Sequence, residues 1–410
     1  MFFNCSSLKN NYSEGFGTSQ VNDYEIRILQ SKNYLNLLNF DSGKVTRMDY
    51  MFSGCSSFYY LDLLNFNTSQ VVNMSNMFSD CKSLVSLDLS NFNTNKLTHM
   101  EKMFYGCSSL KDLNLNNFNT SGVYNMNGLF WDCSNLTSLN ISNFNTSKVT
   151  NMISIFRGCS SLSPLNISNF ITDNVIYMSE MFYSCSNLSS LDLSNFNTSK
   201  VKAMKNMFNS CSMLNYLNIS NFDTSKVTDM SYMFNGCKKL VSLNISNFGT
   251  KNVKDMEFMF NGCSKITSLN LSKFDTSNII NMNSMFRYCS LILSFDLSNF
   301  NTSLVINMNS MFFGCSQLAL LDISNFNTSL VTNLNYMFGE CNSLQILNFK
   351  NFDSSNIKYL YNMFSHCDIL QFINFNNAIF TNNNINDLFL SIQRNISICL
   401  NDYSNLNFDN

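Results

Sequence analysis

Residues 233–258 read MFNGCKKLVSLNISNFGTKNVKDMEF, and close copies of this stretch recur along the 410-residue chain. Its cysteine, Cys237, belongs to a ladder that runs from Cys55 to Cys367 with a constant spacing of 26 residues. A fixed period of this length is typical of a solenoid, in which each repeat packs against its neighbours. The repeat therefore determines the architecture, and function has to be sought where one repeat differs from the next.

Each repeat combines two hydrophobic patterns. Leu61-Asp62-Leu63 alternates apolar and polar residues and predicts a short strand. The apolar residues of 71–78 recur at three- and four-residue spacing, which predicts a helix, with Thr68 or Ser69 as its N-cap. The position before each cysteine is often glycine, as at Gly236, which predicts a left-handed C-cap at the end of that helix.

These units predict an α/β solenoid. Parallel strands lie about 4.8 Å apart, whereas packed helices lie about 8–10 Å apart. We therefore expect a leucine-rich-repeat type of arc of about 14–15 coils, with a parallel sheet on the concave side and short helices on the convex side. The solenoid is predicted over 1–377, with degenerate first coils over 1–34, and 378–410 is predicted to be a C-terminal cap or tail. Because the sequence begins inside a repeat, we expect the chain to be a fragment of a longer one.

Composition bears on the class of function. The chain has 25 basic and 27 acidic residues and a pI of about 5.7, so it offers no basic stripe for nucleic acid. It contains no run of 18 apolar residues, and we predict no transmembrane segment. We expect the chain to act as a monomer.

The cysteine ladder is the most regular chemical pattern. Zinc ligands usually occur in closely spaced pairs, which a 26-residue spacing does not provide. Disulfides between adjacent coils are geometrically conceivable, but equivalent environments give no reason for pairing. We therefore interpret the ladder as buried small apolar side chains and predict no metal site and no cofactor. The two histidines, His99 and His366, lie many repeats apart, and we predict no catalytic residue and no enzymatic activity.

The whole motif resembles a known family. It reads Met-Phe-x-x-Cys-Ser-x-Leu-x-x-Leu-x-Leu-Ser-Asn-Phe-Asn-Thr-Ser-x-Val-x-x-Met and is similar to the BspA-like leucine-rich repeats of mycoplasma, spirochaete, gut-bacterial and trichomonad surface proteins. The family's Phe-x-x-Cys-x-x-Leu core is found at Phe234, Cys237 and Leu240. The resemblance covers about residues 1–377. It implies a leucine-rich-repeat fold at the cell surface or in a secreted protein, and adhesion to a protein or glycan of a host or neighbouring cell.

Carboxylates occur at outward positions on or beside the predicted strands. These candidate contact residues are Asp62, Asp88, Asp112, Asp192, Asp296 and Asp322. We interpret them as part of a solvated Asp/Asn ladder, because an open sheet offers nothing that would raise a pKa. A weak Ca²⁺ site formed by Asp62, Asp88 and Asp112 is the alternative.

Other candidates depart from the serine that usually precedes the first strand leucine. Tyr60 and Tyr216 are predicted contact residues, since tyrosine is favoured at binding hot spots. Leu320, Ile346 and Phe372 would form an apolar stripe on three successive coils. Such a stripe is either an interface or a surface that the C-terminal cap covers.

The polar turns repeat as regularly as the core. The columns that include Asn65 and Thr68 are predicted to hydrogen-bond from coil to coil. A threonine array that matches an ice lattice is a second interpretation, and Asn67-Thr68-Ser69 is a formal N-glycosylation sequon.

Together these observations predict a non-enzymatic cell-surface binding or adhesion module that uses its concave face. An intracellular protein-interaction scaffold that uses the same face is the alternative.

Overall fold

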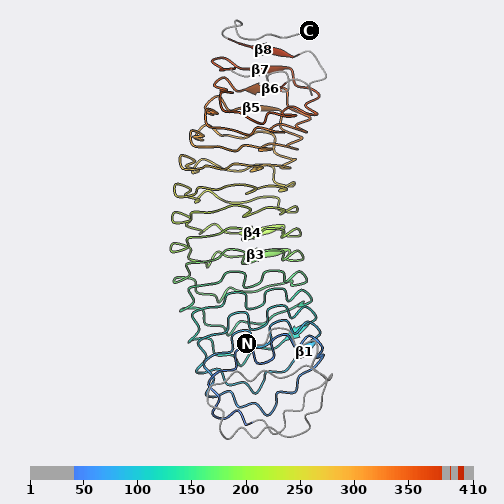
Figure 1. Cartoon of the computed structure of the whole chain (residues 1–410), viewed down its shortest axis with the longest axis vertical. Helices are drawn as coiled ribbons and strands as arrows, with labels where there is room; N and C mark the ends of the chain where they lie inside the picture. Colours follow the sequence, from blue (N-terminus) through green and yellow to red (C-terminus); the bar gives the residue numbers. More distant parts are fainter. Residues whose placement is uncertain (1–40, 381–387, 389–395, 401–410) are drawn as a thin grey trace. The chain divides into compact units, whose positions relative to one another are not determined.

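The computed structural model describes residues 41–380, Leu388 and residues 396–400, so the predicted degenerate coils over 1–34 lie outside the described residues. The chain forms two compact units that divide between Lys200 and Val201. Each unit is a parallel β-solenoid in which one coil follows the next (Figure 1). No helix among the described residues combines the length and the hydropathy of a membrane span.

Short parallel strands form one side of each unit, as the Leu-x-Leu pattern predicts. The first unit contains β1 (Ser86–Leu87), β2 (Asp112–Leu113) and β3 (Ser190–Asp192). The second contains β4 (Tyr216–Asn218) and a four-stranded sheet in the order β5 (Leu320–Asp322), β6 (Ile346–Asn348), β7 (Phe372–Asn374) and β8 (Ser397–Cys399). The register from β5 to β7 joins positions that are 26 residues apart.

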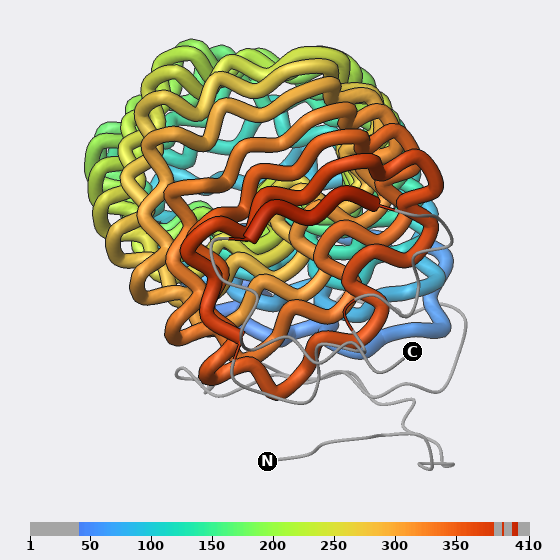
Figure 2. Tube along the Cα trace, turned by 90° about the horizontal axis from the view of Figure 1, so that it is seen from above, coloured from blue at the N-terminus to red at the C-terminus, as the bar shows by residue number. Residues whose placement is uncertain are grey.

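A second ladder of parallel bridges runs along another side of each unit. Figure 2, seen from above, shows how the chain passes around each coil between the strand side and the bridge side. In the first unit the ladder joins Arg47, Asn73, His99, Asn125, Asn151 and Tyr177, and in the second it joins Asp229, Asp255, Asn281, Asn307, Asn333 and Tyr359.

The predicted helices are wrong, because no residue of 41–380 is helical. The Met-Phe segment 230–237 forms consecutive turns instead. The amide of Cys237 donates to the Phe234 carbonyl three residues back (3.2 Å), whereas the amide of Phe234 donates to the Met259 carbonyl of the next coil (2.9 Å). Because amides alternate between their own turn and the next coil, the segment ties neighbouring coils together.

Left-handed backbone causes this alternation. Tyr232 has a φ of 59° and Gly236 a φ of 72°, and the same two positions are left-handed in every repeat between residues 50 and 366. A left-handed residue interrupts the α conformation, so no helix propagates. The left-handed conformation predicted at Gly236 is confirmed, but Gly236 ends a turn and not a helix. Without outer helices, the spacing argument for an arc loses its basis.

Columns of identical side chains fill the core. Phe234, Phe260 and Phe286 stack with ring centroids 5.6 and 5.8 Å apart. The Cys263 thiol is buried beside them and donates to the Phe234 carbonyl at 3.3 Å. Burial raises the pKa of the Cys263 thiol to about 12. The interpretation of the ladder as buried small side chains is confirmed for the described repeats.

The turn threonines also point inward. Thr276 Oγ1 donates to the Asn301 carbonyl at 2.8 Å and accepts the Asn301 amide at 2.7 Å, so one hydroxyl satisfies two backbone groups of the next coil. The predicted coil-to-coil hydrogen bonding is therefore confirmed. The ice-lattice interpretation is wrong, because the threonine column from Thr68 to Thr328 is buried.

Candidate binding surface

In each unit the outward positions in and directly before the Leu-x-Leu segments form a surface that we call the sheet face. In β5 the side chains of Leu320 and Asp322 are exposed and Leu321 between them is buried. This alternation follows from the two-residue period of a strand. The buried position carries the core, so the exposed positions are free to vary between repeats.

The structure places every predicted contact residue on the sheet face with an exposed side chain. In the first unit these residues are Tyr60, Asp62, Asp88, Asp112 and Asp192, and in the second they are Tyr216, Asp296, Leu320, Asp322 and Ile346. Leu320 and Ile346 are direct partners on paired strands. Asp112 is the partner of Ser86 and so lies one column away from Asp88. Their use in binding stays a prediction.

Hydrogen bonds within the strand ends hold the carboxylates in place. Asp88 Oδ1 accepts the Ser90 amide at 2.9 Å, and hydrogen bonds from the Ser90 amide and hydroxyl hold the pKa of Asp88 below its usual value. Among the described residues no three His, Cys, Asp or Glu side chains form a group that could hold a metal ion. The Ca²⁺ alternative at Asp62, Asp88 and Asp112 therefore gains no geometric support.

Leu320 and Ile346 are adjacent on the sheet face of the second unit, and Leu293 is exposed one position before their column. Leu293, Leu320 and Ile346 are 62%, 55% and 47% exposed and come from three successive coils. We call them the apolar patch, which half-buried Phe372 continues by its pairing with Ile346. Sequence reasoning missed Leu293 because it lies one position before the column of Leu320.

The described part of the predicted C-terminal cap extends the sheet. β8 pairs with β7 in parallel, with Ser397 opposite Phe372. Leu320 and Ile346 keep their exposure beside this added strand. Both interpretations of the stripe stay predictions, because residues 381–387 and 389–395 of the predicted cap lie outside the described residues.

A second feature that sequence reasoning missed is an aromatic and basic cluster in the first unit. Tyr105, Trp131, Arg157 and Tyr183 occupy the same repeat position in four successive coils. The Arg157 guanidinium lies 4.7 Å from the Trp131 ring centroid and 4.5 Å from that of Tyr183, and it forms an ion pair with Glu180. The signal in the sequence was the replacement of a small residue such as Ser79 at that position.

A third feature is an exposed aliphatic row at another edge of the second unit, which we call the edge row. Its members are 42–46% exposed and are Ile280, Leu304, Ile306 and Leu330. Leu304 and Leu330 stand where Asn278 and Asn356 donate side-chain hydrogen bonds to the preceding coil. The fold therefore does not require aliphatic residues at these two positions.

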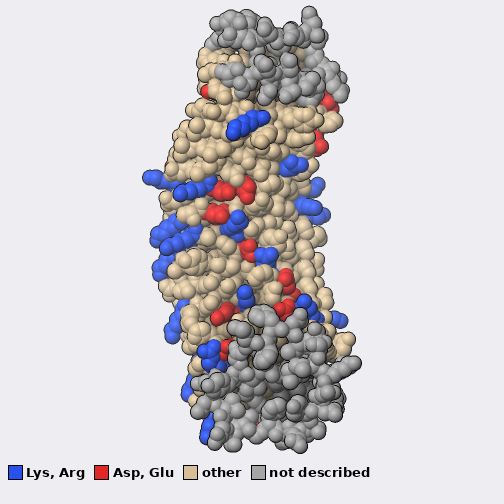
Figure 3. All heavy atoms as spheres, viewed as in Figure 1, with Lys and Arg blue, Asp and Glu red and all other residues tan. Residues whose placement is uncertain are grey.

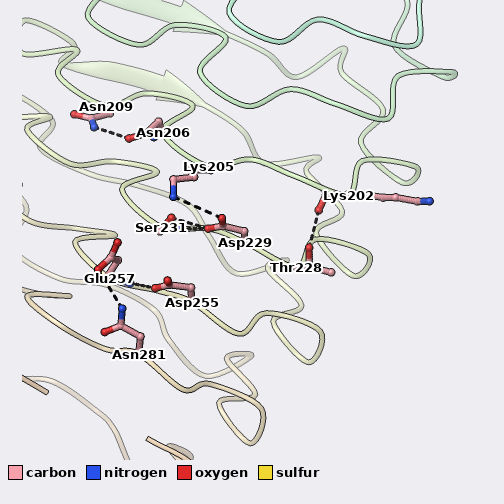
Figure 4. Close-up of polar contacts among 10 residues, drawn as sticks. All are labelled: Lys202, Lys205, Asn206, Asn209, Thr228, Asp229, Ser231, Asp255, Glu257 and Asn281. Atoms are coloured by element: carbon pink, nitrogen blue, oxygen red, sulfur yellow. Dashed lines mark hydrogen bonds and ion pairs between the residues drawn. The ribbon is translucent and has the colours of Figure 1, made fainter. Parts of the chain in front are cut away.

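Charges gather on the bridge ladder of the second unit (Figure 4). Asp255 is half-buried, and burial together with Glu257 and Asp229 raises the pKa of its carboxyl group. Lys205 lies 4.0 Å from Asp229, and Asn281 donates to Glu257 at 3.1 Å. Elsewhere on the face shown in Figure 3, basic side chains project mainly at the sides, and most of the surface is uncharged.

Three solved structures resemble the chain at low identity. A leucine-rich cell surface protein of Faecalibacterium prausnitzii is 15% identical, with a TM-score of 0.42 over 88% of this chain and 84% of that one. A leucine-rich repeat protein of Bacteroides ovatus is 15% identical, with a TM-score of 0.38 over 86% and 99%. The functional domain of InlJ from Listeria monocytogenes, described as including a cysteine ladder, is 14% identical, with a TM-score of 0.22 over 81% and 68%.

No curated protein matches the sequence. A family model matches residues 1–113, 26–138, 100–217, 202–293 and 292–394, which together cover most of the chain. The chain therefore belongs to the family described as Mycoplasma protein of unknown function, DUF285.

Proposed function

We propose that the chain is the binding module of a BspA-like leucine-rich-repeat surface protein. It is non-enzymatic and contacts a protein or glycan of a host or neighbouring cell through its sheet face. The observation that carries this proposal is the exposure of large side chains on strands whose framework is otherwise uniform. Tyr60 and Tyr216 are 51% and 53% exposed at a position where serine is the commonest residue.

The division of labour between positions supports this proposal. The phenylalanine, cysteine and threonine columns are buried in nearly every described repeat, so they give stability but no specificity. Tyrosine has a large contact area and a polar end, which makes it favourable at binding hot spots. Substitutions on the sheet face therefore give a partner a way to distinguish one repeat from another.

Tyr216→Ala tests the proposal. Binding of the purified chain to intact host cells should weaken, because an exposed anchor of the sheet face is lost. Tyr359→Ala is the matched control, since Tyr359 is 57% exposed but lies on the bridge ladder. Both variants should unfold at the temperature of the parent chain. Equal binding by the parent chain and Tyr216→Ala, or an equal loss in both variants, would reject Tyr216 as a contact.

We propose a cell-surface or secreted location for the natural gene product. Labelling of intact cells with a membrane-impermeant reagent should modify it, whereas an intracellular scaffold would be labelled only after lysis. Recovery in the lysed sample alone would favour the intracellular alternative, in which the same face binds a cytosolic protein.

A further inference from the structure

We propose that the apolar patch of the second unit binds an amphipathic helix whose aliphatic stripe is flanked by lysine or arginine. The inference rests on the proposed binding function of the sheet face and names the partner's chemistry. It uses the spacing of Leu320, Ile346 and Phe372, the exposure of Leu320 and Ile346, and the two carboxylates beside them.

The spacing of side chains between coils fits a helical partner better than an extended one. The patch contains one continuous column, because Leu320 pairs with Ile346 and Ile346 pairs with Phe372. Successive coils of this column therefore present one apolar side chain about every 4.8 Å. A helix laid across the strands presents one about every 5.4 Å, whereas an extended chain presents one about every 6.8 Å. Over two coils the mismatch is about 1 Å for the helix and about 4 Å for the extended chain.

The carboxylates beside the patch favour basic residues on the flanks of the partner helix. Asp322 follows Leu320 by two residues and so points to the same face, and Asp296 occupies the equivalent position one coil earlier. Ser298 donates its hydroxyl to Asp296 at 2.7 Å, and the Ser324 amide donates to Asp322 at 2.9 Å. Neither carboxylate has an ion-pair partner within 4.0 Å among the described residues. Two negative charges therefore lie beside the apolar column, and Lys350 acts electrostatically on one of them, Asp322.

Both carboxylates are ionised at neutral pH. The Ser298 hydroxyl and amide hold the pKa of Asp296 below its usual value. Partial burial opposes ionisation of Asp322, but hydrogen bonds from Ser324 and Asn348 and the positive charge of Lys350 outweigh it and lower the pKa of that carboxyl. Lysine or arginine on the partner would meet two ready anions next to the aliphatic contact, which favours a basic partner over an acidic one.

The probe is a synthetic helix of about 18 residues, long enough to retain helicity, with leucine at three- and four-residue spacing and lysine on its flanks. One control peptide replaces lysine by glutamate, and another places leucine at every second residue. Titration calorimetry with the full chain compares the three peptides. The Leu/Lys helix should bind, and both controls should bind at least about tenfold more weakly.

Surface variants locate the binding. The pair Leu320→Ser and Ile346→Ser should weaken binding of the Leu/Lys helix at least about tenfold. The pair Asp296→Asn and Asp322→Asn should weaken it and flatten its dependence on salt. The matched control pair, Leu304→Ser and Leu330→Ser, lies on the edge row and should bind like the parent chain. Thermal unfolding of each variant checks that the fold is intact.

Several results would overturn the inference. They are no binding of the Leu/Lys helix, equal binding of the glutamate or alternating peptide, or an equal loss in the edge-row control. The same variants are assayed for binding to intact host cells. Cell binding that is lost only in the Leu320→Ser and Ile346→Ser pair, without helix binding, would contradict the helical partner and retain the sheet face as the binding surface.

Discussion

At the residue scale, one column shows how the same backbone role is filled by a charged or a neutral side chain. Asp255 continues into Asn281, Asn307 and Asn333 along the bridge ladder. The carboxylate of Asp255 accepts the Glu257 amide at 2.8 Å, and the amide oxygen of Asn281 accepts the Asn283 amide at 3.0 Å. The hydrogen bond is common to the column, and the negative charge is a local addition.

Asp255→Asn should therefore stabilise the chain at pH 7. Burial, Glu257 and Asp229 raise the pKa of the Asp255 carboxyl, so the folded state binds its proton more tightly than the unfolded state does. Stability consequently falls as pH rises through this raised pKa, and asparagine removes that loss. We expect a gain of up to about 1 kcal/mol at this half-buried site, after allowance for solvent screening.

Thermal unfolding at pH 7 and at progressively lower pH measures this effect. The advantage of Asp255→Asn should shrink as the pH approaches the carboxyl pKa, because the parent carboxyl then becomes neutral. Asn281→Asp is the reciprocal variant and should lose stability at pH 7. An advantage that stays constant with pH would show that the charge is not its source.

Two glycines of the second unit allow the effect of left-handed backbone on stability to be tested apart from the effect of steric crowding. A methyl group added to Gly262 would lie 3.5 Å from the nearest atom and one added to Gly249 3.6 Å, so both sites have room. Gly262 has a φ of 73°, and Gly249 does not have left-handed backbone. Gly262→Ala should cost about 1–2 kcal/mol of unfolding free energy. Gly249→Ala should be neutral or stabilise by about 0.4–1 kcal/mol.

Chemical denaturation of the two alanine variants measures both effects. Equal stabilities would mean that the left-handed turn at position 262 is not fixed by the stack. A large loss in Gly249→Ala alone would mean that the packing beside Ser225 is tighter than described.

At the element scale, the Met-Phe turn is the part of the repeat that sequence could not resolve. Apolar side chains at three- and four-residue spacing face one side of a helix, but they face the same side of two consecutive turns. The choice depends on where the amides of Phe234 and Gly236 find acceptors, and both bond to the next coil. That preference is a property of the stack, which a single repeat does not contain.

The strand and the turn columns were predictable for the opposite reason. Leu-x-Leu alternation and the invariant turn threonine each have one low-energy solution once coils stack every 26 residues. Of the binding surface, the exposed columns were predictable from alternation alone. The clusters around Trp131 and Leu293 were not, because they arise from neighbouring coils rather than from any one segment.

The cysteine column makes a prediction about chemical reactivity. Cys263 is fully buried, and desolvation raises the pKa of its thiol to about 12, so almost no thiolate is present at pH 7. Cys399 in β8 is only half-buried. Brief treatment of the folded chain with iodoacetamide, followed by peptide mass mapping, should label Cys399 at least about tenfold faster than Cys263.

Unfolding in denaturant is the control for this labelling, because it should abolish the difference between the two cysteines. Equal labelling rates in the folded chain would mean that the ladder is open to solvent. Such a result would also contradict the stacking of the phenylalanine column beside it.

At the scale of the whole molecule, stability and recognition use different positions of the same repeat. Buried columns recur with few changes and hold each unit together. The sheet face varies, and in the second unit it carries Leu320 and Ile346 beside Asp296 and Asp322. We therefore assign recognition to the irregular positions of the sheet face.

Binding of the fluorescently labelled full chain to intact host cells tests this assignment most directly. The triple variant Leu293→Ser, Leu320→Ser and Ile346→Ser should lose most of the binding while unfolding at the parent temperature. The triple variant Ile280→Ser, Leu304→Ser and Ile306→Ser removes aliphatic side chains that are 42–45% exposed from the edge row and should bind like the parent chain. Unchanged binding of the sheet-face variant, with loss confined to the edge-row variant, would contradict the account.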